Sequence, residues 1–422
     1  MEERFLLRLR NARQVVRVAA EGDGLVKCSV AAMNELRIIE HGSLLVGLDG
    51  RIADVGPVAE VEARHPGATF VEDVDCSGRC LVPGLCDGHT HAVWAGDRVH
   101  EFALKLAGAT YMEIHARGGG IGFTVEHTRA ASEETLYGLL KGRLDRMLAL
   151  GTTLMESKSG YGLETDTEMK MLRVLRRADA EHAVDIVSNF CGAHSVPRGS
   201  TAEAAAADVV ERQLPELARQ RAQGIVGPTL IDVFMEKGVF DAASTERILR
   251  AGSAAGLEHN FHGDELSHQG AAELAGALGS LAVSHLECVS EAGIAALARR
   301  PTVAVLLPAT AYILRLEHPP ARRLLAAGVP LALGSDFNPN AHCLSMPLVM
   351  HMACVNMRLT MPEALSAATL NAAASMGRAA DHGSLQVGKW GDVLLLDAES
   401  WEHLIYQIPP PIATVFKKGK RV

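Results

Sequence analysis

The hydrophobic pattern of the chain changes twice. From residue 1 to about 80, short runs such as LLVGLDG, RIADVG and ATFVEDVD are separated by glycine and aspartate, and no long helical period is present. Runs of this kind predict strands that end in turns. After residue 383 the segment HGSLQVGKWGDVLLLDAES returns to the same pattern. We therefore expect both chain ends, residues 1–80 and 383–422, to build one small β-sandwich domain.

The first residues, MEERFLLRLRNARQVV, have a pattern of their own. Phe5, Leu7 and Leu9 alternate with arginines, which predicts an edge strand. An arginine-rich start is also typical of mitochondrial targeting segments, but the two glutamates in MEER argue against one, and no secretory apolar region follows.

From residue 81 to 382, short apolar runs alternate with stretches of helical length rich in Ala, Leu, Glu and Arg. This alternation indicates repeated βα units. The runs are LVPGLCDGHTH, TTLMESKSGYG, DIVSNFCGAH, TLIDVFMEKG, EHNFHGDE, LAVSHLE, TVAVLLPAT and PLALGSDFNPN. Eight such units close a TIM (β/α)8 barrel, so this segment is expected to be a barrel with its active site at the C-terminal ends of the strands.

Composition and charge narrow the class of protein. With 48% hydrophobic and 22% charged residues the chain is globular. A net charge of −9 without a dense basic cluster argues against nucleic acid as a partner. The longest apolar windows are too short to cross a bilayer, and the eight cysteines lack the paired spacing of a disulfide framework. We expect a cytoplasmic protein that does not bind membranes.

The DGHTH sequence is the first candidate for chemistry. Side chains on a strand alternate between its two faces, so His89 and His91 point the same way. For an isolated pair of this kind, two half-buried structural histidines would be the simpler interpretation.

Further polar residues at later strand ends change this interpretation. HGDE supplies His262 and Glu265, SHLE supplies His285, and GSDFN supplies Asp336. Imidazoles with one carboxylate suit a zinc-like ion that keeps an open coordination position, as a catalytic metal does. The sequence therefore predicts a metal site at the mouth of the barrel.

The same strings resemble a known family. PGLCDGHTH followed by HGDE, SHLE and GSDFNPN is similar to the amidohydrolase superfamily. AGDRVHEFALKLAGATYMEI, ESKSGYGLE, CGAHSVPRG and SDFNPN resemble more specifically the imidazolonepropionase family, over about residues 40 to 407.

The resemblance implies a single metal ion, zinc or iron, held by His89, His91, His262 and Asp336. Some superfamily members hold two ions bridged by a carboxylated lysine from the fourth strand. Here that strand ends in MEKG, and we interpret Lys237 as structural because the family that the chain resembles is mononuclear.

The implied reaction is hydrolysis of a cyclic amide. A water activated by the metal would attack the ring carbonyl of 4-imidazolone-5-propanoate, and cleavage of the ring C–N bond would give N-formimino-L-glutamate. The resemblance makes Asp336 the proton acceptor from water and His285 the residue that orients the nucleophile or polarises the carbonyl. Glu265 would bind the ring nitrogens and carry the proton to them.

Four residues match substrate-binding positions of the family. Arg98 would hold the propanoate carboxylate, which suits the fork of a guanidinium. Tyr161, His194 and Asn338 would contact the rest of the substrate. The string DFNPN continues with Asn340 where we associate a glycine with bacterial members of the family.

Two other functions remain open at this point. One is a related deaminase that releases ammonia from a purine-like ring, and the other is an inactive barrel kept as a scaffold. The Gly-rich segment at 117–124 fits no phosphate-binding motif, and we interpret it as a mobile loop over the barrel mouth. Helices rich in Ala and Leu favour a homodimer.

Overall fold

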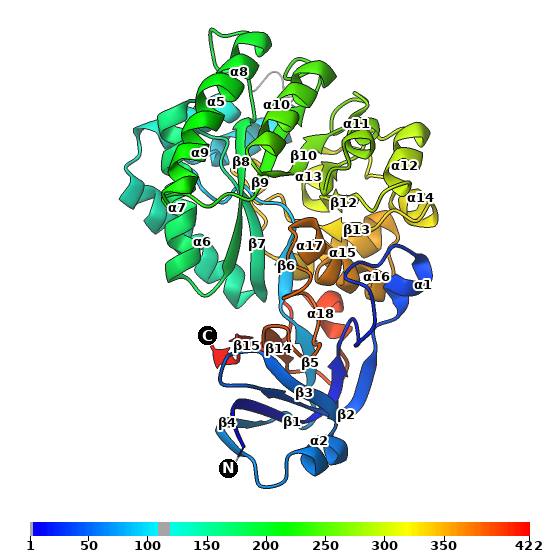
Figure 1. Cartoon of the computed structure of the whole chain (residues 1–422). Coiled ribbons are helices and arrows are strands. Elements are labelled where there is room, and N and C mark those ends of the chain that lie inside the picture. Colours follow the sequence, from blue (N-terminus) through cyan, green and yellow to red (C-terminus); the bar gives the residue numbers. More distant parts are fainter. Residues whose placement is uncertain (1–2, 109–118) are drawn as a thin grey trace.

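The computed structural model describes residues 3–108 and 119–422. A large body of alternating strands and helices carries a smaller β-sheet body, which lies next to both chain termini (Figure 1). Part of the motif AGDRVHEFALKLAGATYMEI, from residue 109 onward, lies outside the described residues.

The large body is the expected eight-stranded parallel barrel. Its strands follow one another around the sheet in chain order, and nearly all of their residues are buried, as in a sheet covered by helices. The strands are β6 (Leu85–Asp87), β7 (Thr152–Lys158), β8 (Asp185–Ala193), β9 (Leu230–Met235), β10 (Glu258–Gly263), β11 (Ala282–His285), β12 (Val303–Leu306) and β13 (Leu331–Leu333).

The ring closes between the first and last strands. The amide of Gly88 donates to the carbonyl of Leu333 at 3.1 Å, and the amide of His91 donates to Phe337 at 2.9 Å. Thr90 and Phe337 form a parallel bridge at the same place. The segment after β6 therefore lies directly beside the segment after β13.

Helices surround the barrel. Those that accompany the first strands are α3 (Val99–Leu106), α5 (Ile121–Ala130), α6 (Glu133–Ala149), α7 (Thr165–Glu181), α8 (Ala202–Asp208), the π-helix η1 (Val209–Gln213), α9 (Leu214–Ala222) and α10 (Ala242–Ala254). The later ones are α11 (Ala271–Leu278), α12 (Glu291–Ala298), α13 (Pro308–Leu314), α14 (Ala321–Ala326), α15 (Met346–Met357), α16 (Met361–Ala367), α17 (Leu370–Ser375) and α18 (His403–Tyr406). Of these helices, α5 and α13 also reach the pocket at the mouth of the barrel.

Helix α6 shows why these stretches are helical. Ser132 caps its N-terminus by accepting a hydrogen bond from the amide of Thr135. Leu136, Leu140 and Leu144 recur at the helical spacing and are fully buried. Burial of such a leucine stabilises the fold by about 2 kcal/mol, so the apolar stripe holds the helix on the barrel.

The small body is one connected sheet built from both chain ends, which confirms the expected fold class. Its strands lie in the order β16, β15, β14, β5, β1, β2 and β3, with β4 also paired to β1. It encloses a core of its own, separate from that of the barrel. The strands are β1 (Arg4–Val16), β2 (Ile38–Val46), β3 (Ile52–Pro57), β4 (Thr69–Asp75), β5 (Cys80–Pro83), β14 (Val393–Leu396), β15 (Ile412–Lys417) and β16 (Lys420–Arg421).

The interpretation of the first strand as an edge strand was wrong. β1 pairs with β2 on one side and with β4 and β5 on the other. The alternation arises because one face of this central strand packs into the core while its arginines lie on the outer face, where Arg8 pairs with Asp73.

Two short helices interrupt the N-terminal strands, where the sequence pattern predicted none. They are α1 (Val30–Asn34) and α2 (Val58–Arg64). α1 lies against α16 of the barrel, where Ser366 donates to the carbonyl of Met33 at 2.9 Å and Asn34 donates to Glu363 at 3.0 Å. This contact adds a further connection between the N-terminal segment and the barrel.

The Gly-rich segment at 117–124 is not a loop throughout. Residues 117 and 118 lie outside the described part of the chain, but Ile121 begins helix α5, preceded by Gly120 with a φ of 69°. Over the described ranges, no helix is long and apolar enough to cross a bilayer, and all eight cysteines are free thiols.

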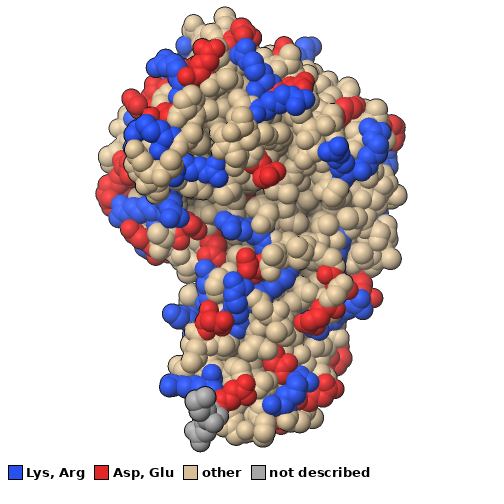
Figure 2. Space-filling model, viewed as in Figure 1, with Lys and Arg blue, Asp and Glu red and all other residues tan. Residues whose placement is uncertain are grey.

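Basic and acidic side chains are interspersed over the face of the molecule shown in Figure 2. No large region of a single sign stands out on this face. Many basic and acidic side chains of the described residues form ion pairs, such as Arg177 with Glu134 at 2.6 Å.

A partly buried charge cluster joins the two bodies. Asp185, at the start of β8, accepts from Lys417 at 2.7 Å, from Lys418 at 2.8 Å and from His382 at 2.9 Å. Lys417 also lies 2.5 Å from Asp392. Burial alone would raise the pKa of Asp185, but His382 and the lysines hold it far below its ordinary value.

Replacing Asp185 with Asn should therefore lower the free energy of unfolding at pH 7 by about 2 kcal/mol, between the values typical of exposed and buried pairs. Because the folded-state pKa is depressed, the stabilisation is complete above the unfolded pKa of about 4 and is lost as the pH falls below it. Urea unfolding at pH 7 and at several lower pH values measures both effects. Asp397→Asn, which removes an exposed partner of Arg79, is the control, and an equal loss there would contradict the prediction.

Candidate metal centre and pocket

A pocket opens at the C-terminal ends of the barrel strands. Two apolar side chains of its wall, Ile121 and Phe234, come from α5 and β9. Of the residues that the sequence predicted, those that line it are His91, Arg98, Tyr161, His194, His262, Glu265, His285, Asp336 and Asn338. His89 is fully buried beside them and its ring contacts that of His262, with 4.5 Å between centroids. The structure thus brings all ten predicted residues together.

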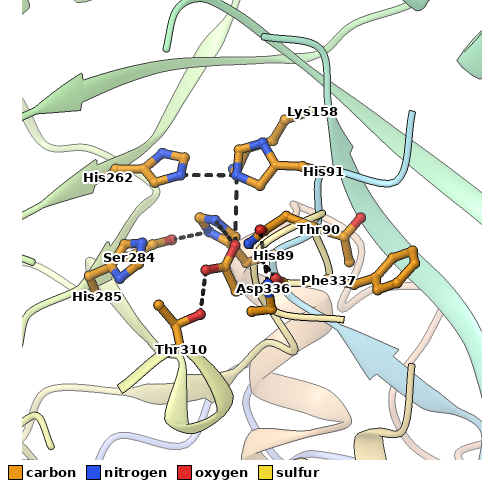
Figure 3. Close-up of polar contacts among 12 residues, drawn as sticks. His89, Thr90, His91, Lys158, His262, Ser284, His285, Thr310, Asp336 and Phe337 are labelled. Atoms are coloured by element: carbon orange, nitrogen blue, oxygen red, sulfur yellow. Dashed lines mark hydrogen bonds and ion pairs between the residues drawn. The ribbon is translucent and has the colours of Figure 1, made fainter. Parts of the chain in front are cut away.

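Four donor atoms converge at the base of this pocket (Figure 3). Nε2 of His91 lies 3.1 Å from Nε2 of His262. Oδ1 of Asp336 lies 3.5 Å from Nε2 of His89 and 3.7 Å from Nε2 of His91. Ligand atoms held at about 2.0–2.1 Å in a tetrahedron around one ion lie about 3.3–3.4 Å apart. The spacing therefore fits a shared metal ion.

The chemical state of these groups also fits a metal. Burial lowers the pKa of His89 and His91 well below the ordinary value, so both rings are neutral and can offer a lone pair. Nε2 of His89 and Oδ1 of Asp336 are buried without a hydrogen-bond partner among the described residues. Unpartnered buried polar atoms are costly, and an ion coordinated by them would remove that cost.

Two hydroxyl groups contact the sides of His89 and Asp336 that face away from the metal site. Ser284 on β11 contacts Nδ1 of His89 at 2.9 Å, which leaves Nε2 facing the site. Thr310, at the start of α13, donates to Oδ2 of Asp336 at 2.5 Å, which leaves Oδ1 facing the histidines. Such outer contacts orient metal ligands.

The backbone at Asp336 is held in an unusual conformation. Its φ is 49°, a region that non-glycine residues rarely adopt, and its amide donates to the carbonyl of His89 at 3.0 Å. Two residues earlier, a side chain on Gly334 would meet the backbone nitrogen of His89 at 2.9 Å. The glycine in GSDFN thus allows β13 to approach the ligand segment closely.

His285 lies between two buried carboxylates. Its Nε2 is 3.6 Å from Glu265, and its Nδ1 is 3.6 Å from Glu287. Burial lowers the pKa of His285, but the two glutamates outweigh it and raise the pKa to about 10. Burial raises the pKa of Glu265 to about 8 despite the opposing effect of His285. The Glu265–His285 pair therefore holds a proton beside the pocket near neutral pH, where it is suited to donation.

Arg98 is held by an acidic partner and is not an exposed loop residue. It precedes α3 and is 5% exposed. Its Nε and Nη2 donate to one oxygen of Glu101 at 2.9 and 2.7 Å, and the other oxygen of Glu101 accepts from the amide of Gly120. The guanidinium is thereby fixed at the pocket wall, with donors left for another anion.

His194 and Tyr161 form an aromatic wall beside His91. The His194 ring stacks on that of His91 with 4.5 Å between centroids, and the Tyr161 ring lies 5.2 Å from that of His194. Nδ1 of His194 contacts the carbonyl of Gly160 at 3.0 Å and so carries its hydrogen. Since burial lowers the pKa of His194 to about 3, the ring is neutral and its Nε2 is an acceptor.

The Asn338 amide is engaged in the loop that follows β13. Its Nδ2 donates to the carbonyl of Asp336 at 2.7 Å, and its Oδ1 accepts from the amides of Asn340 and Ala341. Asn340 also accepts from Lys105. Asn340, which stands where we associate a glycine with bacterial family members, thus bonds to Asn338 within the loop and to Lys105 of α3.

Sequence reasoning missed several polar residues around the site. Lys158, Glu156 and Asp232 are fully buried inside the barrel, and Glu287, Thr310 and Glu101 contact predicted site residues. The charged residues inside the apolar runs TTLMESK and TLIDVF could have indicated the three buried ones. Lys237 is exposed and does not line the pocket, whereas its neighbour Glu236 accepts from the amides of Leu266 and Ser267.

Comparison with solved structures agrees with the architecture. An adenosine deaminase from Xanthomonas campestris with bound zinc matches with a TM-score of 0.69, and the match covers 100% of this chain and 93% of the deaminase. The two sequences are 19% identical, so the likeness concerns the fold alone.

Comparison with sequences is more specific. The sequence profile of the amidohydrolase family matches residues 80–422. A probable imidazolonepropionase of Mus musculus is 57% identical, over 95% of this chain and 94% of the mouse protein. One from Xenopus laevis is 56% identical, over 100% of this chain and 97% of its own length. The chain therefore belongs to the amidohydrolase family and, within it, to the family of the probable imidazolonepropionases.

Proposed function

We propose that this protein hydrolyses 4-imidazolone-5-propanoate to N-formimino-L-glutamate, with one zinc or iron ion bound at the barrel mouth. The observation that carries the proposal is the convergence of three histidines and one aspartate in a chain that matches probable imidazolonepropionases over nearly its full length. The neighbouring acid, base and guanidinium groups supply the other functions that this reaction needs.

His89, His91, His262 and Asp336 would hold the ion. Three imidazoles and a carboxylate accept either zinc or iron. When bound, a zinc-like ion lowers the pKa of a coordinated water from about 15.7 to near 7, which makes a hydroxide available at neutral pH.

Asp336 and Glu265 would manage the protons. Oδ2 of Asp336, held by Thr310, is the carboxylate oxygen that points away from the ligand nitrogens and would accept a proton from the attacking water. The nitrogen that leaves when the ring opens needs a proton, and Glu265 lines the same pocket with a pKa raised by burial. His285, next to Glu265, would orient the water or polarise the ring carbonyl.

Arg98 and His194 would select the substrate by its two ends. The guanidinium of Arg98 suits the propanoate carboxylate. The acceptor at Nε2 of His194 suits an N–H group of the ring and would not bind a carboxylate. Tyr161 beside His194 would pack against the flat ring, and Asn338 would close the pocket from the loop after β13.

A cytoplasmic location and a homodimer remain predictions of this proposal. The homodimer is supported by apolar side chains that a second copy of the chain could cover. Val355, Tyr406 and Ile408 are 65%, 72% and 63% accessible.

The direct test is an assay of ring opening. Purified protein loaded with zinc or iron should consume 4-imidazolone-5-propanoate and form N-formimino-L-glutamate. A chelator should abolish turnover, and either ion should restore it. Release of ammonia from a purine-like amidine by metal-loaded protein that leaves the imidazolone intact would contradict the proposal.

Glu265→Gln should lower kcat about 10²- to 10⁴-fold, because the amide cannot transfer the proton that the leaving nitrogen needs. Bound metal, measured by elemental analysis, should be unchanged because Glu265 is not one of the four ligands. Glu258→Gln, an exposed glutamate at the start of the same strand β10, is the control and should keep the wild-type rate. A near-normal rate for Glu265→Gln would remove this residue from the mechanism.

Replacing Arg98 with Met, together with Glu101→Gln so that no buried carboxylate loses its cation, should raise KM about 10- to 100-fold. This range corresponds to the loss of a hydrogen bond to a charged group, which contributes about 1.5–3 kcal/mol of binding free energy. The effect should vanish with a substrate analogue that carries a neutral amide in place of the carboxylate. Arg250→Met, in an exposed pair on α10, should leave KM unchanged, and an unchanged KM in the double variant would disprove carboxylate binding by Arg98.

A further inference from the structure

Three charged side chains are fully buried beneath the metal site. Lys158, at the end of β7, lies with its Nζ 2.5 Å from Oε1 of Glu156 and 2.7 Å from Oδ2 of Asp232. All three side chains have zero accessibility. In the view of Figure 3, Lys158 lies behind His91. None of the three lines the pocket, so none of them is placed to touch a substrate.

The carboxylate of Asp232 holds the histidine ligand His262 directly. Oδ1 of Asp232 accepts from Nδ1 of His262 at 2.8 Å and from the backbone amide of the same residue at 3.1 Å. The side-chain contact fixes the tautomer and the rotation of the ring, so that Nε2 faces the other ligands.

The carboxylate of Glu156 holds the DGHTH segment, which carries His89 and His91. Oε2 of Glu156 accepts from the amide of Thr90, which lies between His89 and His91, at 3.1 Å. The Thr90 hydroxyl donates to the carbonyl of Glu156 at 2.8 Å, and the amide of Lys158 donates to the carbonyl of Thr90 at 2.9 Å. This end of β7 is therefore bound to the DGHTH segment at three points.

Stability alone is a weak reason for such a cluster. A buried ion pair costs desolvation that often offsets its attraction, and apolar side chains of similar size serve a core equally well or better. Here the cluster joins elements that carry the three histidine ligands, so its benefit lies in their relative placement.

We propose that Lys158, Glu156 and Asp232 are positioning residues that set the spacing of His89, His91 and His262 before a metal binds. Lys158 links the two carboxylates, and each carboxylate fixes one part of the ligand set. This inference rests on the metal site of the proposed function but not on its substrate.

The test measures metal affinity in the absence of substrate. Metal-free protein is titrated with Zn²⁺ against a chromogenic chelator, and its thermal midpoint is recorded with and without Zn²⁺. Asp232→Asn, which keeps the shape of the side chain but removes its charge, should weaken zinc binding about 10- to 100-fold. The zinc-dependent rise in the thermal midpoint should shrink accordingly. Glu156→Gln should also weaken binding.

Asp185→Asn is the matched control. Asp185 is also a carboxylate of the barrel sheet that pairs with a lysine, Lys417, but it lies at the N-terminal end of its strand, whereas the metal site lies at the C-terminal ends. It should destabilise the protein while leaving zinc affinity within about twofold of wild type. An equal loss of zinc affinity in the control would overturn the inference, as would wild-type affinity in Asp232→Asn. If Asp232→Asn does not fold, Glu156→Gln decides in the same way.

A double-mutant cycle separates positioning from general damage. If Asp232 acts through His262, the variants His262→Ala and His262→Ala/Asp232→Asn should bind zinc with equal affinity. A further loss in the double variant would overturn the inference. Since no substrate is present, failure of the ring-opening assay would leave these results intact, and unchanged zinc affinities would leave the proposed reaction intact.

Discussion

The backbone seam between the first and last barrel strands is the constraint on which the site depends. Hydrogen bonds from His91 to Phe337 and from Asp336 to His89 place two segments side by side that lie at opposite ends of the barrel sequence. Without closure, the carboxylate of Asp336 would have no access to the histidines. The positive φ of Asp336 and the close approach at Gly334 show how tightly the chain is bent to make this seam.

Most of the architecture could be predicted because it follows from periodic patterns. Each of the eight apolar runs forms a strand, since runs buried on both faces carry no competing helical period. The site residues could be found for a related reason: polar side chains at the ends of such runs, as at His262 and Asp336, must meet once the strands are parallel. Their assignment to one ion and one substrate needed the resemblance to a family.

Other features depend on contacts that a pattern does not contain. β1 has the alternating pattern of an edge strand. It lies inside the sheet because β4 and β5, which come later in the chain, pair with its second edge. Lys158 and Asp232 look like interruptions of apolar runs until the fold places them within 2.7 Å of each other. The partner of Arg98 is Glu101, only one helical turn away, yet the sequence does not tell which of several nearby acids will face it.

The small sheet has a consequence for how the chain is synthesised. β5 pairs on one side with β1 and on the other with β14, which begins only at Val393. During translation the N-terminal strands can therefore assemble early, but one side of β5 stays unpaired until the whole barrel has been made. Open strand edges invite pairing with other chains. A chain that stalls before β14 would carry every barrel strand and still expose this edge, so completion of the C-terminus protects the N-terminus from aggregation.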